Sequence, residues 1–463
     1  MYQSTISDRV SYYLAVLRTM VTTCGVTAVV LACGPAISRG NDGVPSGLQS
    51  LEKSHKQLKS IPLQVAETGA KLQDFCVNRE GQVVALLANK AQIGSMGALL
   101  SKIKAGGKES QTAQVRILDH EGTLVRQWDV DFVGEAIGVG PDGIVYVGGN
   151  GVLASYDAEG KLLQRHDAPQ TTLLANKEEL QEHAKEQLEA EKQSITEQLK
   201  QFEAILDDPK QLEEIEKQYQ AQLDEQLKSQ AKAASDDSKK EAPVRPKIQF
   251  NVKQMYEQQV KALKSRKEST VEQMVASITT RLKQVNAIAV SDQDVFIACP
   301  MSKGYGYAVW RTDRDLQNPK QVISGLSGCC GQMDIQASGD QVFVAENSRH
   351  RVVRYNRDGK KQGTFGKTDR EGVGEGFGGC CNPMNLCFAA DGGLLAAESN
   401  GVVKRFTSDG KYEGLVGIAK VPEGCKNSAI GISTDGQQVY YIDIQNSNII
   451  ILARDERAAA KSE

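Results

Sequence analysis

Short apolar stretches separated by turns recur along most of the chain. Residues 136–139 and 144–147 are apolar runs on either side of Pro141-Asp142-Gly143. A third run, residues 152–156, is followed by the turn residues Glu159-Gly160. Short runs bounded by Gly, Asp and Pro are typical of β-strands, and Asp-Gly or Glu-Gly pairs are typical of hairpins. The pattern therefore predicts units built from short antiparallel strands.

Two segments have nearly the same sequence and lie 51 positions apart (380 − 329). One reads Cys329-Cys330-Gly331-Gln332-Met333 and the other reads Cys380-Cys381-Asn382-Pro383-Met384. The residues that follow also match, with 342–347 corresponding to 394–399 and Asp358-Gly359 corresponding to Asp409-Gly410. Similarity at a fixed spacing is typical of repeat architectures, so the chain is an array of related units.

The units begin near residues 70, 133, 284, 328, 379 and 424. The last has only three predicted strands, at residues 429–433, 439–442 and 449–452. An apolar-alternating stretch ahead of the first unit, residues 61–66, is expected to supply the fourth strand, because closing a ring removes unpaired sheet edges. The pattern predicts an all-β, six-bladed β-propeller.

One stretch carries a family resemblance. Residues 343–352, Phe-Val-Ala-Glu-Asn-Ser-Arg-His-Arg-Val, resemble the NHL repeat, whose units run through Asp-Gly to a Val-Tyr-Val-Ala-Asp-like strand and an Asn-Arg-Val-like turn. The resemblance covers residues 60–167 and 284–455 and implies an NHL-like six-bladed propeller. Related six-bladed propellers include lactone hydrolases that hold a divalent cation with Glu, Asp and Asn. Fold alone leaves the function open, because one fold serves many functions.

Residues 171–283 interrupt the strand pattern and are rich in Glu, Gln, Lys, Ala and Leu, a helix composition. Apolar residues recur there at helical spacing: Leu188, Ile195, Leu199, Leu206, Met274, Ile278 and Leu282. Asp208-Pro209 predicts that a helix restarts there, and residues 231–247 are expected to be a mobile linker. We expect an inserted α-helical hairpin or coiled-coil segment, which either packs on itself or on the propeller, or serves as an arm for self-association or partner binding.

The N-terminal residues predict export. Arg9 and Arg18 precede an apolar run over residues 20–36, which is typical of a secretory signal peptide. Val30-Leu31-Ala32-Cys33 approximates the bacterial lipobox, so the alternatives are an ordinary signal peptide and a lipoprotein signal that places a membrane-anchoring lipid on Cys33. Either alternative predicts a periplasmic or cell-envelope protein. With a net charge of −3, the 463-residue chain has no basic field to attract nucleic acid.

These patterns divide the chain into a signal peptide (1–36), a flexible spacer (37–59), the closing strand with the first two blades (60–170), the helical insertion (171–283), the other four blades (284–455) and a disordered tail (456–463).

Repeat register places the candidate site on one face. In a propeller, the loop that enters the first strand of a blade and the loop between its second and third strands open at the same end. The predicted binding face at that end consists of Cys299, Cys329, Cys330, Cys380, Cys381, Cys425, Glu346, Asn347, Arg349, Glu398 and Asp443. We expect a protein or a small-molecule ligand to bind there, with the acidic residues otherwise solvating the blade rim.

The chemistry of the cysteines is left open between three alternatives. Outside the signal segment there are eight, an even number in an exported chain, which favours disulfides such as Cys330 with Cys380 or Cys381 with Cys425. A metal site is the second alternative, although adjacent cysteines lack the usual two-residue gap. Redox exchange is the third. No cofactor is expected unless a metal ion binds the cysteine and acidic face, in which case a lactonase-like or thiol-dependent enzyme is the alternative to a binding module.

Overall fold

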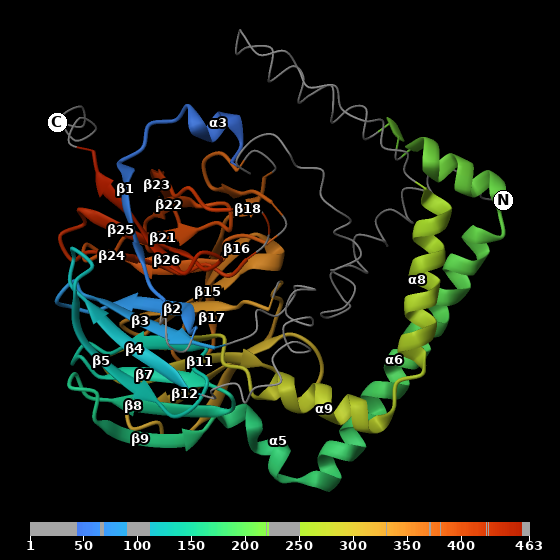
Figure 1. Cartoon of the computed structure of the whole chain (residues 1–463), viewed down its shortest axis with the longest axis horizontal. Helices are drawn as coiled ribbons and strands as arrows, with labels where there is room; N and C mark the ends of the chain where they lie inside the picture. The colour runs from blue at the N-terminus through green and yellow to red at the C-terminus, as the bar shows by residue number, and fades with distance from the viewer. Residues whose placement is uncertain are drawn as a thin grey trace. The chain divides into compact units, whose positions relative to one another are not determined.

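A computed structural model describes residues 44–64, 69–89, 112–218, 220–221, 251–329, 331–369, 372–379, 381–422, 424 and 426–455 of the chain. The predicted signal segment with Cys33, the linker 231–247, the tail 456–463 and Cys330, Cys380 and Cys425 lie outside these residues. The chain divides into two compact units, one formed by residues up to Ala175 and from Thr280 onward, and the other by Asn176–Thr279 (Figure 1).

The first unit consists of four-stranded antiparallel sheets in which consecutive strands pair in chain order. Among the described residues, the strands of five such sheets are β2 (Lys71–Val77), β3 (Val83–Ala88), β4 (Ala113–Leu118) and β5 (Leu124–Val130); β6 (Ala136–Val139), β7 (Val145–Gly149), β8 (Val152–Tyr156) and β9 (Leu162–Asp167); β10 (Ala287–Val290), β11 (Asp294–Pro300), β12 (Tyr307–Asp313) and β13 (Lys320–Leu326); β14 (Asp334–Ser338), β15 (Gln341–Glu346), β16 (Arg351–Asn356) and β17 (Lys361–Phe365); and β20 (Asn385–Phe388), β21 (Leu394–Ala397), β22 (Val402–Phe406) and β23 (Tyr412–Ile418).

A sixth four-stranded sheet combines the two ends of the chain. It contains β24 (Ile430–Ile432), β25 (Gln438–Asp443) and β26 (Asn448–Arg454), and β1 (His55–Pro62) pairs antiparallel with β26. Figure 1 shows β1 in blue beside the red C-terminal strands. The predicted closing strand at residues 61–66 is therefore misplaced, because β1 begins at His55.

The first strands of the sheets lie side by side in a closed cycle. In chain order β2 contacts β6, β6 contacts β10, β10 contacts β14, β14 contacts β20 and β20 contacts β24, and β24 returns to β2. Each sheet also shares an apolar core with the next: Val84 packs with Val147 between the first two, and Phe75 packs with Tyr440 where the last meets the first. A cyclic array of four-stranded sheets is a β-propeller.

Part of the segment expected as a flexible spacer is folded. Helix α3 (Ser46–Gln49) precedes β1, and Val44 and Leu48 are buried against Val402 and Leu415 of the fifth sheet. Residues 44–59 thus belong to the folded unit, because burial of these two apolar side chains and pairing with β26 outweigh the polar composition that suggested a spacer.

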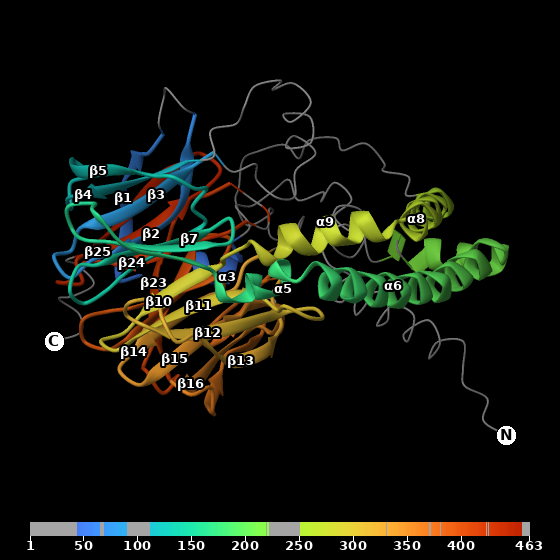
Figure 2. The same ribbon diagram turned by 90° about the horizontal axis from the view of Figure 1, so that it is seen from below.

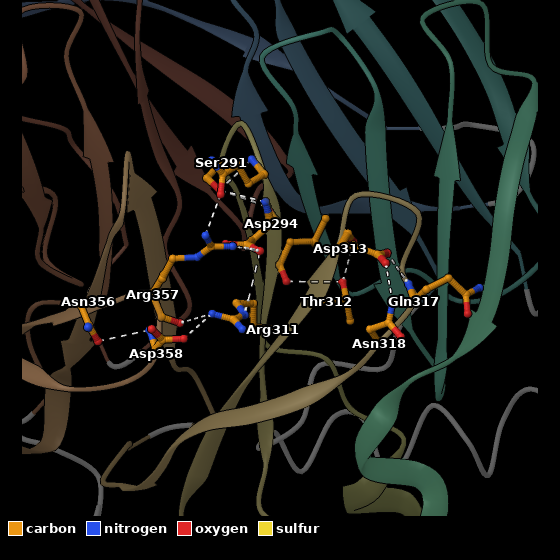
Figure 3. A network of polar contacts seen from close by, with 12 residues as sticks. Ser291, Asp294, Arg311, Thr312, Asp313, Gln317, Asn318, Asn356, Arg357 and Asp358 are labelled. Carbon is orange, nitrogen blue, oxygen red and sulfur yellow. Dashed lines mark hydrogen bonds and ion pairs between the residues drawn. The ribbon is translucent and has the colours of Figure 1, made fainter.

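Polar contacts join neighbouring sheets at the end of the ring where first strands lead into second strands. Arg357, after β16, donates to Asp294 at the start of β11 across 2.8 Å, and Arg311 of β12 donates to Asp358 across 2.7 Å. Figure 3 shows these side chains reaching across from their two sheets. Arg314 makes the corresponding contact with Asp142, at 2.6 Å, between the second and third sheets.

The second unit is helical, as the composition predicts. Its main helices are α6 (Lys177–Leu206) and α8 (Val252–Lys267), which lie side by side (Figure 2). Ile195 and Leu199 of α6 pack against Val260 and Leu263 of α8. The stripe of α6 is therefore covered by α8 rather than by the 271–285 stripe, whose residues form α9 (Val271–Leu282). The first unit also contains three short helical elements, η1 (Pro169–Thr171), α5 (Thr172–Ala175) and the 3₁₀ turn η2 (Asn347–Arg349).

The predicted helix restart is confirmed, because the Asp208 carboxylate accepts hydrogen bonds from the backbone N–H groups of Lys210 and Gln211 at 3.0 and 3.2 Å. Of the helices in the described ranges, none has a stretch long and apolar enough to span a membrane.

Candidate functional site

The candidate site is built from two loops at one end of the ring. One loop, residues 327–333, leads into β14, and the other, residues 366–384, leads into β20. The turns that follow β15 and β21 open at the same end, because strands alternate in direction within each sheet. We call this end the mouth, and its described part consists of residues 327–329, 331–333, 346–350, 378–379, 381–384 and 398–401.

A buried carboxylate anchors the first loop. Glu346 ends β15 and is 1% exposed. It accepts a hydrogen bond from the backbone N–H of Ser327 at 3.2 Å, and it forms ion pairs with Arg349 at 3.2 Å and Arg351 at 2.5 Å. The two guanidinium groups compensate for burying this charge, so Glu346 holds the loop rather than solvating the rim as expected.

A second carboxylate anchors the second loop in the corresponding way. Glu398 follows β21, is fully buried, and accepts a hydrogen bond from the backbone N–H of Gly378 at 3.2 Å. Its cationic partner is Lys404 of β22, at 2.8 Å. Ser327 and Gly378 are 51 positions apart (378 − 327), so the repeat preserves the contact even though the cation changes from arginine to lysine.

The glycine-rich stretch ahead of the second loop is also anchored. Gly376–Phe377 forms strand β19, which pairs with β18 (Lys367–Thr368), and the Lys404 ammonium donates to the carbonyl oxygens of Gly372 and Gly376. Phe377 is completely buried. A glycine-rich composition suggests flexibility, but burial of Phe377 and the ammonium contacts fix this stretch in place.

Two asparagines complete the support of the cysteine loops. Asn347 accepts from the backbone N–H of Cys329 at 2.8 Å and donates to the carbonyl oxygen of Gln332 at 3.2 Å and to the Met384 sulfur at 3.4 Å. Asn382 donates to the Gly378 carbonyl at 2.7 Å and accepts from the backbone N–H of Ser399 at 2.8 Å. Both loops are therefore fixed by side chains as well as by backbone.

As a result, a cysteine in the loop that enters β14 contacts a cysteine in the loop that enters β20. The Cys381 Sγ lies 2.7 Å from the Cys329 Sγ. Cys381 is fully buried and Cys329 is partly exposed. The expected pairings of Cys330 with Cys380 and of Cys381 with Cys425 involve residues outside the described ranges.

Other predicted site residues occupy different environments. Cys299, in β11, is completely buried, and burial raises the pKa of its thiol. Asp443, at the end of β25, is buried and accepts from the Asn446 side chain at 2.7 Å. Arg349 is 51% exposed and is available for contact with a ligand. Cys299 is thus an inert core residue, since the thiolate and not the thiol is the reactive form.

Polar side chains on the first strand of several sheets also join neighbouring sheets, and no motif in the sequence indicated them. Asp74 accepts from the backbone N–H of Ile137 at 3.0 Å, Asp334 from that of Leu386 at 2.7 Å, and Asn385 from that of Ile430 at 2.9 Å. Each of these residues lies in the first strand of its sheet. Its side chain accepts a hydrogen bond from the backbone of the first strand of the next sheet. The 51-residue spacing of the repeat aligns Asp334 with Asn385, so this spacing could have indicated a shared role for the two residues.

Burial perturbs the ionisable groups of these first strands. It raises the pKa of Asp74 to about 7 and that of Asp334 well above its ordinary value, since nearby apolar atoms disfavour the charged form. Burial also raises the pKa of the Cys76 and Cys387 thiols, with a smaller contribution from Asp74 and Asp334 respectively. These two cysteines are therefore held as neutral thiols.

No group of three or more His, Cys, Asp and Glu side chains suited to a metal ion occurs within the described ranges. The lactone-hydrolase resemblance suggests Glu346, Glu398, Asn347 and Asp443 as ligands of a divalent cation. Instead, the glutamate oxygens bind arginine, lysine and backbone N–H groups. The Asn347 oxygen accepts from the Cys329 N–H, and the Asp443 carboxylate accepts from Asn446. What the described mouth offers chemically is a pair of adjoining sulfurs on two rigid loops.

Comparison with known proteins returned no matching family model and no matching curated protein. Among solved structures, the crystal structure of the Myceliophteria thermophila Cps50 (Swd1) β-propeller domain matches with a TM-score of 0.39 and 10% sequence identity, covering 87% of this chain and 100% of that chain. A match at this level supports no statement about function, so the fold assignment rests on the strand pairing described above.

Proposed function

We propose that the chain is an exported, six-bladed, NHL-type propeller that acts as a binding or scaffolding module through the mouth. The N-terminal signal pattern supports export to the periplasm or cell envelope, and Cys33 supports anchoring by a lipid. The partner is a protein in this proposal, with a small molecule as the alternative ligand.

The observation that carries the proposal is the double anchoring of the loops. Glu346 and Glu398 are buried charges, each with a cationic partner, and each fixes one loop. Burying ionic groups is costly and gains little stability over apolar packing. Such groups are well suited to specify one loop conformation, and a preformed loop loses less conformational entropy when it binds a partner.

Exposed side chains around the mouth have the chemistry of a protein contact surface. Tyr305, between β11 and β12, is 59% exposed, and Val373, in the loop that enters β20, is 41% exposed. Arg349 adds a half-exposed guanidinium. Tyrosine and arginine are enriched among the residues that contribute most to protein–protein affinity, so these side chains favour a protein partner.

The helical unit contributes less to the proposal. The self-association hypothesis required an available apolar stripe, and the described stripe of α6 packs against α8. A lactonase-like activity has no supporting observation among the described residues, because the oxygens of Glu346 and Glu398 already have partners.

Affinity capture from envelope extracts of the source cells tests the binding role. The full chain is compared with a Tyr305→Ala/Val373→Ala variant and with Lys161→Ala, an exposed substitution in the hairpin before β9, at the opposite end of the ring. We expect proteins retained by the wild type and Lys161→Ala to be lost with the double variant. Equal retention by all three would contradict binding at the mouth, and so would the absence of any retained protein.

A further inference from the structure

We propose that Cys329 and Cys381 form a reversible disulfide that joins two neighbouring sheets across the mouth. The two sulfur atoms lie 2.7 Å apart, although the residues are 52 positions apart (381 − 329) and belong to different four-stranded sheets. The separation is about 0.65 Å longer than the sulfur–sulfur bond of a disulfide, about 2.05 Å.

The approach of the sulfurs follows from the construction of both loops. Asn347 bonds to the N–H of Cys329 at 2.8 Å and so fixes the backbone of that cysteine. Next to Cys381, the Asn382 side chain is bonded to Gly378 at 2.7 Å and to Ser399 at 2.8 Å. Asn347 also contacts Met384 in the second loop at 3.4 Å, so the two supports are linked to each other.

The distance between the two cysteine sulfurs is closer to that of a disulfide than to that of two sulfurs bound to one metal ion. Two thiolates about 2.3 Å from one tetrahedral zinc ion are separated by about 3.7 Å. The observed separation of 2.7 Å is shorter than that and closer to the bonding distance.

The two cysteines have different exposure, which assigns each a role in the reaction. Cys329 is partly exposed, whereas Cys381 is fully buried. The Cys329 thiolate attacks a low-molecular-weight disulfide and releases one thiol, forming a mixed disulfide. The Cys381 thiolate then attacks the Cys329 sulfur and releases the second thiol. The protein loses two electrons and two protons, and the small disulfide gains them.

The bond would join the loops that enter β14 and β20 covalently, and both loops belong to the proposed binding surface. Formation of the disulfide requires no binding partner, so it can be tested with the purified full chain. Failure of the disulfide is therefore distinguishable from failure of the binding role.

Peptide mapping across a series of oxidised to reduced glutathione ratios tests the proposal. Trypsin separates Cys329, in residues 321–349, from Cys381, in residues 371–404. Because Cys330 and Cys380 lie on the same peptides, the mapping uses a Cys330→Ser/Cys380→Ser variant. We expect these peptides to be joined in oxidising buffer and separate, with both cysteines alkylated, in reducing buffer.

The matched control adds Cys381→Ser to that variant and is expected to abolish the joined peptide, which excludes a contribution from Cys387. The oxidised double variant should also melt on the order of 10 °C above its reduced form, because the bond closes a 52-residue loop (381 − 329). The proposal is overturned by separate, alkylated peptides in oxidising buffer, by a joined peptide that persists in the control, or by cysteines that react only after a chelator is added.

Discussion

Glu398 and Lys404 form an ion pair in which both side chains are almost completely removed from solvent. The ammonium also donates to two carbonyl oxygens of the stretch that leads to the second cysteine loop. The pair therefore connects strand β22, the end of β21 and that loop. A buried pair of this kind adds little net stability, but removing one partner leaves an uncompensated charge.

Replacement of Lys404 by methionine is expected to lower the free energy of unfolding by about 3–5 kcal/mol, because Glu398 would remain buried without its cation. Removing the second charge as well, in Lys404→Met/Glu398→Gln, is expected to restore at least half of that loss. Urea unfolding midpoints measure both effects, with exposed Lys411→Met as the control. A Lys404→Met variant within about 1 kcal/mol of the wild type would show that the pair is not structural.

Asp74 gives the molecule a pH dependence. Burial raises its pKa in the folded chain to about 7, whereas an unfolded aspartate titrates near 4. Between these values the folded form keeps a proton that the unfolded form has released, so stability falls as pH rises from about 4 to about 7. In the fifth sheet, the Asn385 side chain accepts the equivalent hydrogen bond from the Ile430 N–H at 2.9 Å, and an asparagine does not ionise.

We therefore expect Asp74→Asn to be more stable relative to the wild type at pH 8 than at pH 4, by on the order of 2 kcal/mol. Urea unfolding at the two pH values measures the difference. An equal difference in the free energy of unfolding between variant and wild type at both pH values would contradict a raised pKa of Asp74.

At the residue scale, the repeat register correctly aligned Glu346 with Glu398 and placed both beside the cysteine loops. It did not reveal that they are buried, because an acidic residue at a strand end is usually solvated. Their partners Ser327 and Gly378 supply backbone N–H groups, which no side-chain pattern can indicate.

At the element scale, hairpin glycines fit each sheet against the one before it. Gly359, between β16 and β17, has φ +85°, and a Cβ there would lie 1.7 Å from the Val322 carbonyl oxygen of β13. Gly410 similarly faces Phe365 of β17. Glycine in these Asp-Gly turns therefore has two roles. It allows the chain to reverse, and its lack of a side chain allows the neighbouring sheet to pack closely.

Gly359→Ala is expected to lower the free energy of unfolding by about 2–3 kcal/mol more than Gly436→Ala. Gly436 also has a positive φ, +67°, but no atom lies within 4 Å of the position that a Cβ would take, so it reports the conformational cost alone. Denaturation midpoints of the two variants give the comparison. Equal losses would show that the contact with β13 can relax.

Strand prediction succeeded where both faces of a strand are apolar or alternate clearly. Strands β6 and β8 begin and end at the predicted residues. Strand β1 was misplaced because six of its eight residues are exposed, and its lysines and serine resemble a spacer. Its position is determined by pairing with β26, a long-range contact that local pattern does not encode.

At the scale of the whole molecule, ring closure links the chain ends. Pairing of β1 with β26 completes the last sheet, and Leu72 of β2 donates its N–H to Ser447 Oγ at 2.8 Å where that sheet meets the first. Repeat counting predicted that closure was needed, and the cyclic packing of the sheets is what brings the loops of Cys329 and Cys381 to one mouth. The separation of the two sulfurs, by contrast, depends on side-chain contacts that only the structure provides.

The central claim is therefore a closed ring that holds the cysteine loops at one mouth. Hydrogen–deuterium exchange of the full chain tests it most directly, because the amides of β1 are protected only if that strand is paired. The account predicts protection of β1 (His55–Pro62) comparable to that of β26 (Asn448–Arg454). Exchange of β1 as fast as that of an unfolded peptide, with β24–β26 still protected, would contradict it.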